Sequence, residues 1–212
     1  MDSPSKPLRW LTWGALIATI AGIAVAFLVS IVQNARVPEL PVISSIPDFA
    51  FTNQNSKLVT KSDLLGRITL ADVIFTRCAG PCPVMTRKMS ELQRRLPADA
   101  PVRLLTITTD PPYDTPTVLK QYSARFNADD KRWWLLTGPK REIAEFIVKG
   151  LKLVAQEKAA SEQTAPEDLF IHSTMFVLLD KQARLRAAFD SDEADFQKKV
   201  EAAIKRLAKE RN

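Results

Sequence analysis

Residues 68–85 read ITLADVIFTRCAGPCPVM and contain both cysteines of the 212-residue chain, Cys78 and Cys82. The first eight residues of this stretch are mostly apolar or β-branched, which is typical of a buried central strand. Pro83 suits the first turn of a helix, and Met85 begins a series of apolar residues at helical spacing. The stretch therefore predicts a strand, a turn with two cysteines, and a helix.

The rest of the chain continues this alternation of strands and helices. We expect strands at residues 48–53, 58–59, 68–75, 102–109, 132–138, 173–180 and 183–190, and helices that begin near residues 83, 115, 139 and 191. The alternation implies a parallel core sheet with an antiparallel edge formed by the last two strands, and residues 154–169 form a polar inserted loop. The fold class is therefore α/β, a thioredoxin-like fold with an N-terminal β-hairpin extension. In such open sheets, sites gather at the carboxyl ends of the strands, where the cysteines lie.

An apolar segment precedes this domain. Residues 10–32 carry no charged side chain, and a helix of this length rises about 34 Å, enough to cross a bilayer core of about 30 Å. Lys6 and Arg9 come before the segment, so the positive-inside rule places the N-terminus in the cytoplasm and the domain on the periplasmic or equivalent outer face. A cleaved signal peptide is the alternative, although its apolar core is usually shorter.

Four regions follow from this interpretation. We assign residues 1–9 to a cytoplasmic N-terminus, 10–32 to a transmembrane anchor, 33–46 to a Pro-containing linker and 47–212 to the folded domain. The composition is that of a folded protein, with 46% hydrophobic and 25% charged residues. The net charge is +6, but the basic residues are spread along the chain and form no stripe that would follow a phosphate backbone, which argues against a nucleic-acid partner.

The spacing of the two cysteines favours shared chemistry. Cys78 and Cys82 lie four positions apart at the expected start of a helix, where side chains at i and i+4 share a face. The helix N-terminus favours negative charge, so we expect lowered thiol pKa values and thiolate near neutral pH. Two thiolates are soft ligands that suit Cu(I) or Zn(II), and they can equally exchange with a disulfide.

The only histidine, His172, lies just before an expected core strand, and in a thioredoxin-like sheet that loop lies beside the cysteine turn. His172 is therefore placed to complete a site with two sulfurs and one nitrogen, which copper accepts in the Cu(I) state and supplements with weak ligands as Cu(II). Structural zinc normally takes four protein ligands. Asp110 follows another strand directly; it could reach the metal shell as an accessory, or only shape the turn into the next helix.

A second function uses the same cysteines without metal. In a thiol–disulfide oxidoreductase, one of Cys78 and Cys82 attacks a partner disulfide and the other resolves the mixed disulfide, so both would be catalytic. His172 would then be a neighbour that activates a thiol. A redox sensor built on the cysteine pair is a further variant. Whether the chain is an enzyme therefore stays open on the residues alone.

From about residue 46 to its end, the chain resembles the Sco/SenC family of membrane-anchored copper chaperones. The segments VIFTRCAGPCPVMTRKMSEL, TITTDPPYDTPTVLKQYSARF, WWLLTG and FIHSTMFVLLD carry the resemblance, in the family's order. Two details depart from it: CAGPC lacks the common proline after its first cysteine, and Pro112 stands where a glutamate is usual.

The resemblance implies a copper site of Cys78, Cys82 and His172, with Asp110 as a possible accessory. It also implies delivery of copper, as Cu(I) or Cu(II), to the binuclear copper site of cytochrome c oxidase, or reduction of the cysteines that form that site. The implied partners are the copper-bearing subunit of the oxidase, other copper carriers and thioredoxin-like reductants.

Overall fold

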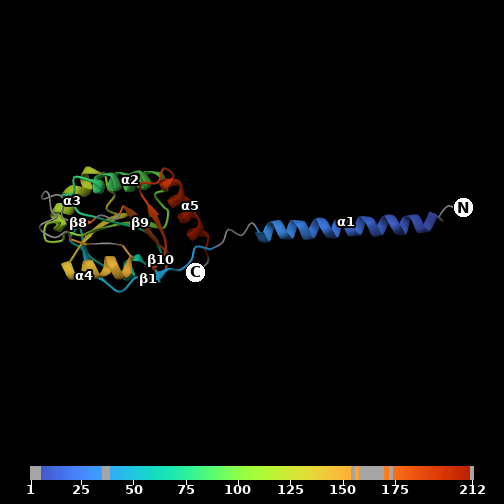
Figure 1. Cartoon of the computed structure of the whole chain (residues 1–212), viewed down its shortest axis with the longest axis horizontal. Helices are drawn as coiled ribbons and strands as arrows, with labels where there is room; N and C mark the ends of the chain where they lie inside the picture. Colours follow the sequence, from blue (N-terminus) through green and yellow to red (C-terminus); the bar gives the residue numbers. More distant parts are fainter. Residues whose placement is uncertain (1–5, 35–38, 154–155, 158–169, 172–173, 211–212) are drawn as a thin grey trace. The chain divides into compact units, whose positions relative to one another are not determined.

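The computed structural model describes the whole chain except residues 1–5, 35–38, 154–155, 158–169, 172–173 and 211–212 (Figure 1). The chain divides into two compact units, residues 1–38 and residues 39–212. The first unit consists of helix α1 (Lys6–Asn34). Within it, Trp13–Ser30 has a mean hydropathy of 2.1, so α1 is long and apolar enough to cross a membrane, a property that anchors and signal sequences share.

The second unit contains a sheet, its covering helices and two short strands apart from the sheet. The strands are β1 (Ser44–Ser45), β2 (Ala50–Asn53), β3 (Leu58–Thr60), β4 (Ile68–Ile74), β5 (Val102–Thr108), β6 (Trp133–Thr137), β7 (Gln156–Glu157), β8 (Phe170–Ile171), β9 (Met175–Leu179) and β10 (Arg184–Asp190). The helices are the 3₁₀ turn η1 (Lys61–Leu64), α2 (Pro81–Arg95), α3 (Pro116–Arg125), α4 (Lys140–Glu145), the π-helical turn η2 (Phe146–Gly150) and α5 (Phe196–Lys209). The short strands β7 and β8 pair with each other at the two ends of the segment we expected to be an inserted loop.

Eight strands form the main sheet in the order β1-β10-β9-β4-β5-β6-β2-β3. Strands β4, β5 and β6 are parallel, because α2 after β4 and α3 after β5 each return the chain to the same end of the sheet. The hairpin β9–β10 adds to β4 antiparallel, and the hairpin β2–β3 adds to β6. The predicted parallel core, late antiparallel hairpin and N-terminal hairpin are therefore confirmed.

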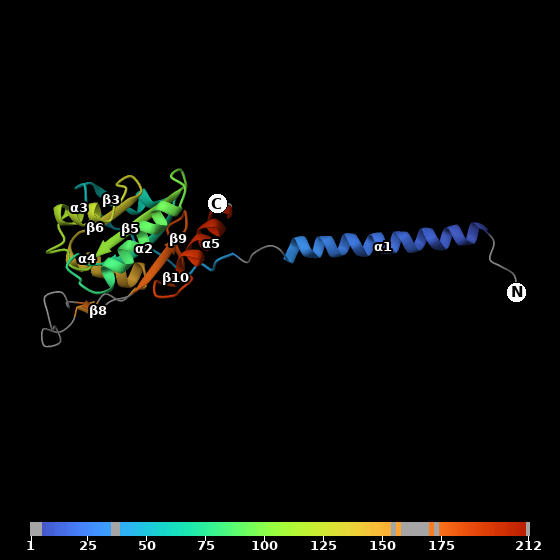
Figure 2. The same ribbon diagram turned by 90° about the horizontal axis from the view of Figure 1, so that it is seen from above.

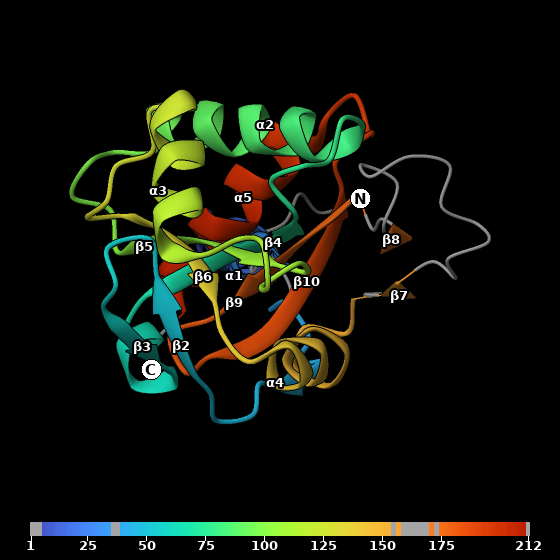
Figure 3. The same cartoon turned by 90° about the vertical axis from the view of Figure 1, so that its left-hand side faces the viewer.

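Helices cover both faces of this sheet. Helices α2, α3 and α5 lie on one face, and α4 with η2 lies on the other (Figures 1 and 3). Seen from above, α2 and α5 lie side by side over the sheet (Figure 2), where Arg95 of α2 forms an ion pair with Glu201 of α5. Every residue of β4 is buried, so its alternate side chains enter two separate cores. Leu70 and Ile74 pack toward α2, whereas Val73 packs toward α4.

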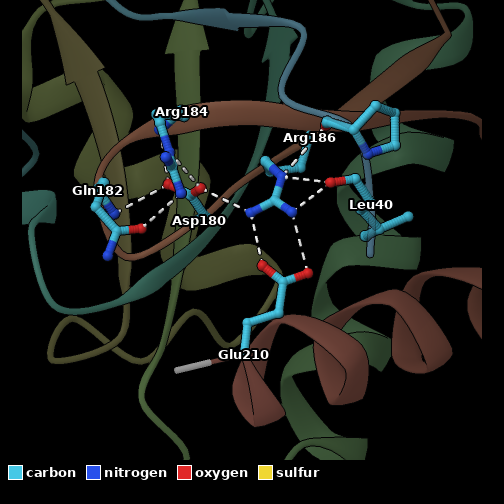
Figure 4. A network of polar contacts seen from close by, with 7 residues as sticks. Leu40, Asp180, Gln182, Arg184, Arg186 and Glu210 are labelled. Carbon is cyan, nitrogen blue, oxygen red and sulfur yellow. Dashed lines mark hydrogen bonds and ion pairs between the residues drawn. The ribbon is translucent and has the colours of Figure 1, made fainter. Parts of the chain in front are cut away.

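The packing of the domain begins before residue 47. Within the range 33–46 that we assigned to a linker, Ser44–Ser45 form β1 against β10, and Ile46 is 1% exposed. The side chain of Arg186 extends this attachment to Leu40, whose carbonyl accepts from the guanidinium (Figure 4).

Arg186 is the centre of a buried polar network. Its side chain is 3% exposed, and a register irregularity between residues 185 and 187 marks its place in β10. The guanidinium donates to Asp180 at 2.9 Å and to the two carboxylate oxygens of Glu210 at 2.8 and 3.0 Å (Figure 4). One side chain thus ties together residues near both ends of the second unit.

This network lies at the amino end of β4. Ser44 pairs with Leu185, Leu185 pairs with Leu179, and Leu179 pairs with Thr69, the second residue of β4. The attachment of residues 40–46 is therefore at the end of the sheet opposite to the one where β4 leads into the cysteine turn.

Candidate functional site

The cysteine turn lies where the sequence predicts it. Strand β4 ends at Ile74, α2 begins at Pro81, and the backbone N–H of Cys78 donates to the Phe75 carbonyl at 3.2 Å. Cys82 is the second residue of α2. Both cysteines are reduced and buried, with exposed fractions of 4% for Cys78 and 2% for Cys82.

The two thiols are adjacent and hydrogen-bonded to each other. This hydrogen bond and the burial of the site raise the pKa of Cys82, since removing its proton would also place a second negative charge beside Cys78. Our expectation that the helix N-terminus would lower both thiol pKa values is therefore wrong for Cys82. The dipole of the helix is outweighed by desolvation and by the partner sulfur.

The third expected ligand, His172, lies outside the described residues. Its described neighbours are Ile171, which ends β8, and Thr174, which precedes β9. Since β9 runs antiparallel to β4, its first residue lies at the end of the sheet where β4 ends. Among the described residues, no group of three or more His, Cys, Asp or Glu side chains could hold a metal ion.

Residues of the loop after β5 bind the residues just before Cys78. Asp110 forms an ion pair with Arg77, the residue before Cys78, at 2.5 Å between Nη2 and Oδ2. The Arg77 guanidinium also stacks 4.2 Å from the ring centroid of Tyr113. One oxygen of the Asp110 carboxylate is thus engaged by Arg77, and the role of Asp110 as an accessory ligand stays a prediction.

Asp114, from the same loop, holds the residue before Arg77. Its carboxylate accepts from the backbone N–H of Thr76 at 3.1 Å and from the hydroxyls of Thr76 and Thr108. Asp114 is fully buried, and desolvation raises its pKa. Both acids of the DPPYD segment therefore position the residues just before Cys78.

A buried carboxyl group beneath the cysteines was missed altogether. Asp72 of β4 is 0% exposed and faces the α2 side of the sheet, between Leu70 and Ile74. Its Oδ1 accepts from the Thr106 hydroxyl at 2.6 Å, while Oδ2 has no hydrogen-bond partner among the described residues. Burial raises the pKa of Asp72 to about 7. A lone acid within an otherwise apolar strand was the available sequence signal.

Substitution of Asp72 by asparagine should flatten the pH dependence of stability. The pKa of Asp72 is 3.8 in the unfolded chain and about 7 in the folded protein, so the folded state holds the proton more tightly. The contribution of this protonated carboxyl group to the free energy of unfolding is therefore fully present below about pH 4 and is lost as the pH rises through 7. The shift corresponds to about 4 kcal/mol. Urea unfolding at pH 4, 6 and 8 should show Asp72→Asn gaining stability relative to wild type as the pH rises.

Asp48 offers a matched control, because its side chain is 97% exposed. Asp48→Asn should leave the pH profile of wild type unchanged. Parallel profiles for wild type and Asp72→Asn would show that Asp72 ionises as readily in the folded protein as in the unfolded chain.

The donor set of the site fits a soft metal ion. Two neighbouring sulfurs at the start of a helix match the preference of Cu(I) for thiolates, and a pair of reduced thiols can also take part in thiol–disulfide exchange. The geometry of the described residues is therefore compatible with copper binding and with dithiol chemistry.

Comparison with known proteins identifies the family. Residues 41–209 match the family model described as SCO1/SenC. The SCO1 protein homolog of Bacillus subtilis (strain 168) is 34% identical over 147 residues, which cover 68% of this chain and 73% of that protein. Two solved structures share the fold. BsSco, described as a member of the Sco family of cytochrome c oxidase assembly proteins with a disulfide switch, has a TM-score of 0.69 at 28% identity and covers 82% of this chain and 100% of its own.

The second is ScoI of Bradyrhizobium japonicum with copper bound, with a TM-score of 0.65 at 27% identity over 77% of this chain and 99% of its own. These structures confirm the predicted thioredoxin-like fold. The family match begins at residue 41, where the packing of the domain also begins, and it extends through helix α5. The chain belongs to the SCO1/SenC family.

Proposed function

We propose that the chain is a copper carrier that binds one copper ion through Cys78, Cys82 and His172 and passes it on during assembly of the binuclear copper site of cytochrome c oxidase. The observation that carries this proposal is the pair of adjacent, reduced thiols at the carboxyl end of β4. The relatives add support, since one is described with copper bound and another as an oxidase assembly protein.

His172 is the third ligand in this proposal. The described residue Thr174 lies two positions away, at the end of the sheet where the cysteine turn begins. An imidazole is the borderline donor that copper accepts beside two thiolates. A site with two sulfurs and one nitrogen leaves coordination positions open, so a donor from an acceptor protein can enter before the carrier's ligands leave. Such ligand exchange suits a copper ion that is cargo and has to be released.

The apolar helix α1 supports a location beside a membrane enzyme. We infer that it remains as an anchor, with the N-terminus in the cytoplasm and the copper site on the periplasmic or equivalent outer face. An anchored carrier searches for its acceptor in two dimensions. The copper-bearing subunit of the oxidase is the proposed acceptor, and other copper carriers or thioredoxin-like reductants are the proposed donors of copper and electrons.

Replacement of His172 by alanine tests the ligand set. We expect the full chain, reduced and in neutral detergent, to bind one Cu(I) per molecule in competition with a chromogenic chelator. His172→Ala should weaken that affinity by at least about 100-fold, because even the loss of a residue that only orients a metal ligand costs 10–100-fold. X-ray absorption should show nitrogen scattering in wild type that the variant lacks. Equal affinity in the two proteins would remove His172 from the site.

A second function, thiol–disulfide exchange, is favoured by the hydrogen bond between the two thiols. In that reaction Cys78 and Cys82 lose two electrons and two protons and form a disulfide, while a partner disulfide gains them and becomes two thiols. The two activities are linked, because copper binding requires the reduced pair. Insulin reduction by the copper-free chain, and trapping of a mixed disulfide with Cys82→Ser, would reveal this activity separately from copper binding.

A further inference from the structure

A cleft of about 600 Å³ opens directly beside the cysteine turn. One wall consists of Thr76 and Arg77, the two residues before Cys78, and the opposite wall consists of Gln121, Tyr122 and Arg125 of α3. One hydrogen bond links the α3 wall to the cysteine helix, because the hydroxyls of Tyr122 and Thr86 lie 2.8 Å apart. Within α2, Thr86 in turn donates to the carbonyl of Cys82 at 2.8 Å. The cleft and the thiols therefore share one rigid frame.

The lining of this cleft is cationic. Arg125 stacks on the ring of Tyr122, with 4.8 Å between the guanidinium carbon and the ring centroid, and it forms no ion pair with any described residue. On the other wall, Arg77 is held between the Tyr113 ring and Asp110. Each guanidinium group stacks on an aromatic ring, and among the described residues that line the cleft there is no carboxylate.

One acid compensates one of the two arginines: Asp110 pairs with Arg77, which leaves Arg125 as the cleft cation without an ion pair among the described residues. Residues 75–90 contain three basic side chains and no acidic one, and α3 has Lys120 and Arg125 but no Asp or Glu. Asp114, the acid nearest to the start of α3, is buried and occupied by two threonines. Among the described residues, the Arg125 wall of the cleft is therefore positive, and an arginine stacked in this way matches a carboxylate.

We infer that this cleft is the docking site for an acidic segment of the protein that exchanges copper or disulfide with Cys78 and Cys82. The inference rests on the proposed function for the identity of the exchanging site, and it adds the recognition element. Asp or Glu side chains of the partner bind Arg125 and bring the partner's sulfur or metal ligands to the cysteine turn. Electrostatic docking of this kind raises the rate of encounter more than the final affinity.

Two small disulfides that differ in charge test the inference on the full chain in neutral detergent. The first is 3,3′-dithiodipropionate, which carries two carboxylates, and the second is bis(2-hydroxyethyl) disulfide, which is neutral. Each oxidises the reduced pair, forming the Cys78–Cys82 disulfide and two small thiols. The measured quantity is the ratio of the two second-order rate constants, acidic probe over neutral probe.

Arg125→Gln should lower this ratio about threefold or more at low ionic strength, and added salt should reduce the difference between wild type and variant. The matched control is Arg141→Gln on α4, which removes the same charge from a side chain that is 91% exposed on the opposite face of the sheet. Its ratio should equal that of wild type.

An unchanged ratio in Arg125→Gln, or an equal fall in Arg141→Gln, would overturn the docking site. Copper stoichiometry of wild type and Arg125→Gln is measured in parallel. A chain that binds no copper would refute the proposed carrier function. The docking site would still be decided separately, because the rate ratio depends on the two thiols and needs no copper.

Discussion

Replacement of either Cys78 or Cys82 by serine is expected to reduce bound copper from one ion per chain to nearly none. A serine hydroxyl is a hard, neutral donor at neutral pH, whereas Cu(I) prefers thiolate sulfur. One remaining thiol cannot hold the ion against a competing chelator. The measurement is elemental analysis of the full chain after Cu(I) loading and gel filtration, with thermal unfolding to confirm that each variant is folded.

Met85→Leu is the control for this experiment. Met85 lies on α2, three positions after Cys82, and its thioether is an alternative sulfur, but it is 1% exposed and packs in the core. A volume-conserving change of this kind usually costs less than about 1.5 kcal/mol, so copper binding should persist. Full copper loading of both serine variants would contradict a site built on the cysteine pair.

Replacement of Arg186 by leucine is expected to destabilise the folded domain strongly. The substitution leaves Asp180 and Glu210 without their shared cation, and it removes the donor to the Leu40 carbonyl. Breaking a buried ion pair by removing one partner costs about 3–5 kcal/mol. The lower part of this range applies here, because the Glu210 side chain is 20% exposed and Asp180 keeps Arg184.

Arg184→Leu is a control two residues away on the same strand. Arg184 pairs with the same Asp180 at 2.8 Å, but its side chain is 39% exposed, so its loss should cost about 1 kcal/mol or less. Urea unfolding of the two variants gives the comparison. If both lost the same stability, burial of the Arg186 network would contribute nothing beyond an ordinary surface pair.

Sequence patterns predicted the sheet well because its strands follow a simple rule. The buried runs at β4 and β5 and the helical spacing after each one define parallel units, and the cysteine turn follows from the end of β4. The hairpin β9–β10 was likewise predicted from two apolar runs joined by a short turn. Family resemblance added the expected ligand set, which neither cysteine spacing nor composition specifies alone.

Interactions between distant segments could not be predicted in the same way. The bonds from Asp114 to Thr76 and from Asp110 to Arg77 join residues more than 30 positions apart, and local periodicity carries no information about them. The raised pKa of Cys82 comes from its hydrogen bond to Cys78 and from burial, and the burial depends on the tertiary structure. Likewise, the sequence around Arg186 does not indicate its hydrogen bonds to Leu40 and Glu210, which are distant along the chain.

The two ends of strand β4 carry different features of the domain. Residues 40–46 are fastened at its amino end and the sulfurs lie past its carboxyl end, so about 23 Å of extended strand separates them. The sheet thus separates the attachment of residues 40–46 from the cysteine turn. Contacts that a partner makes at the cysteine turn therefore need not disturb the contacts of Leu40, Ser44 and Ile46 at the other end of the strand.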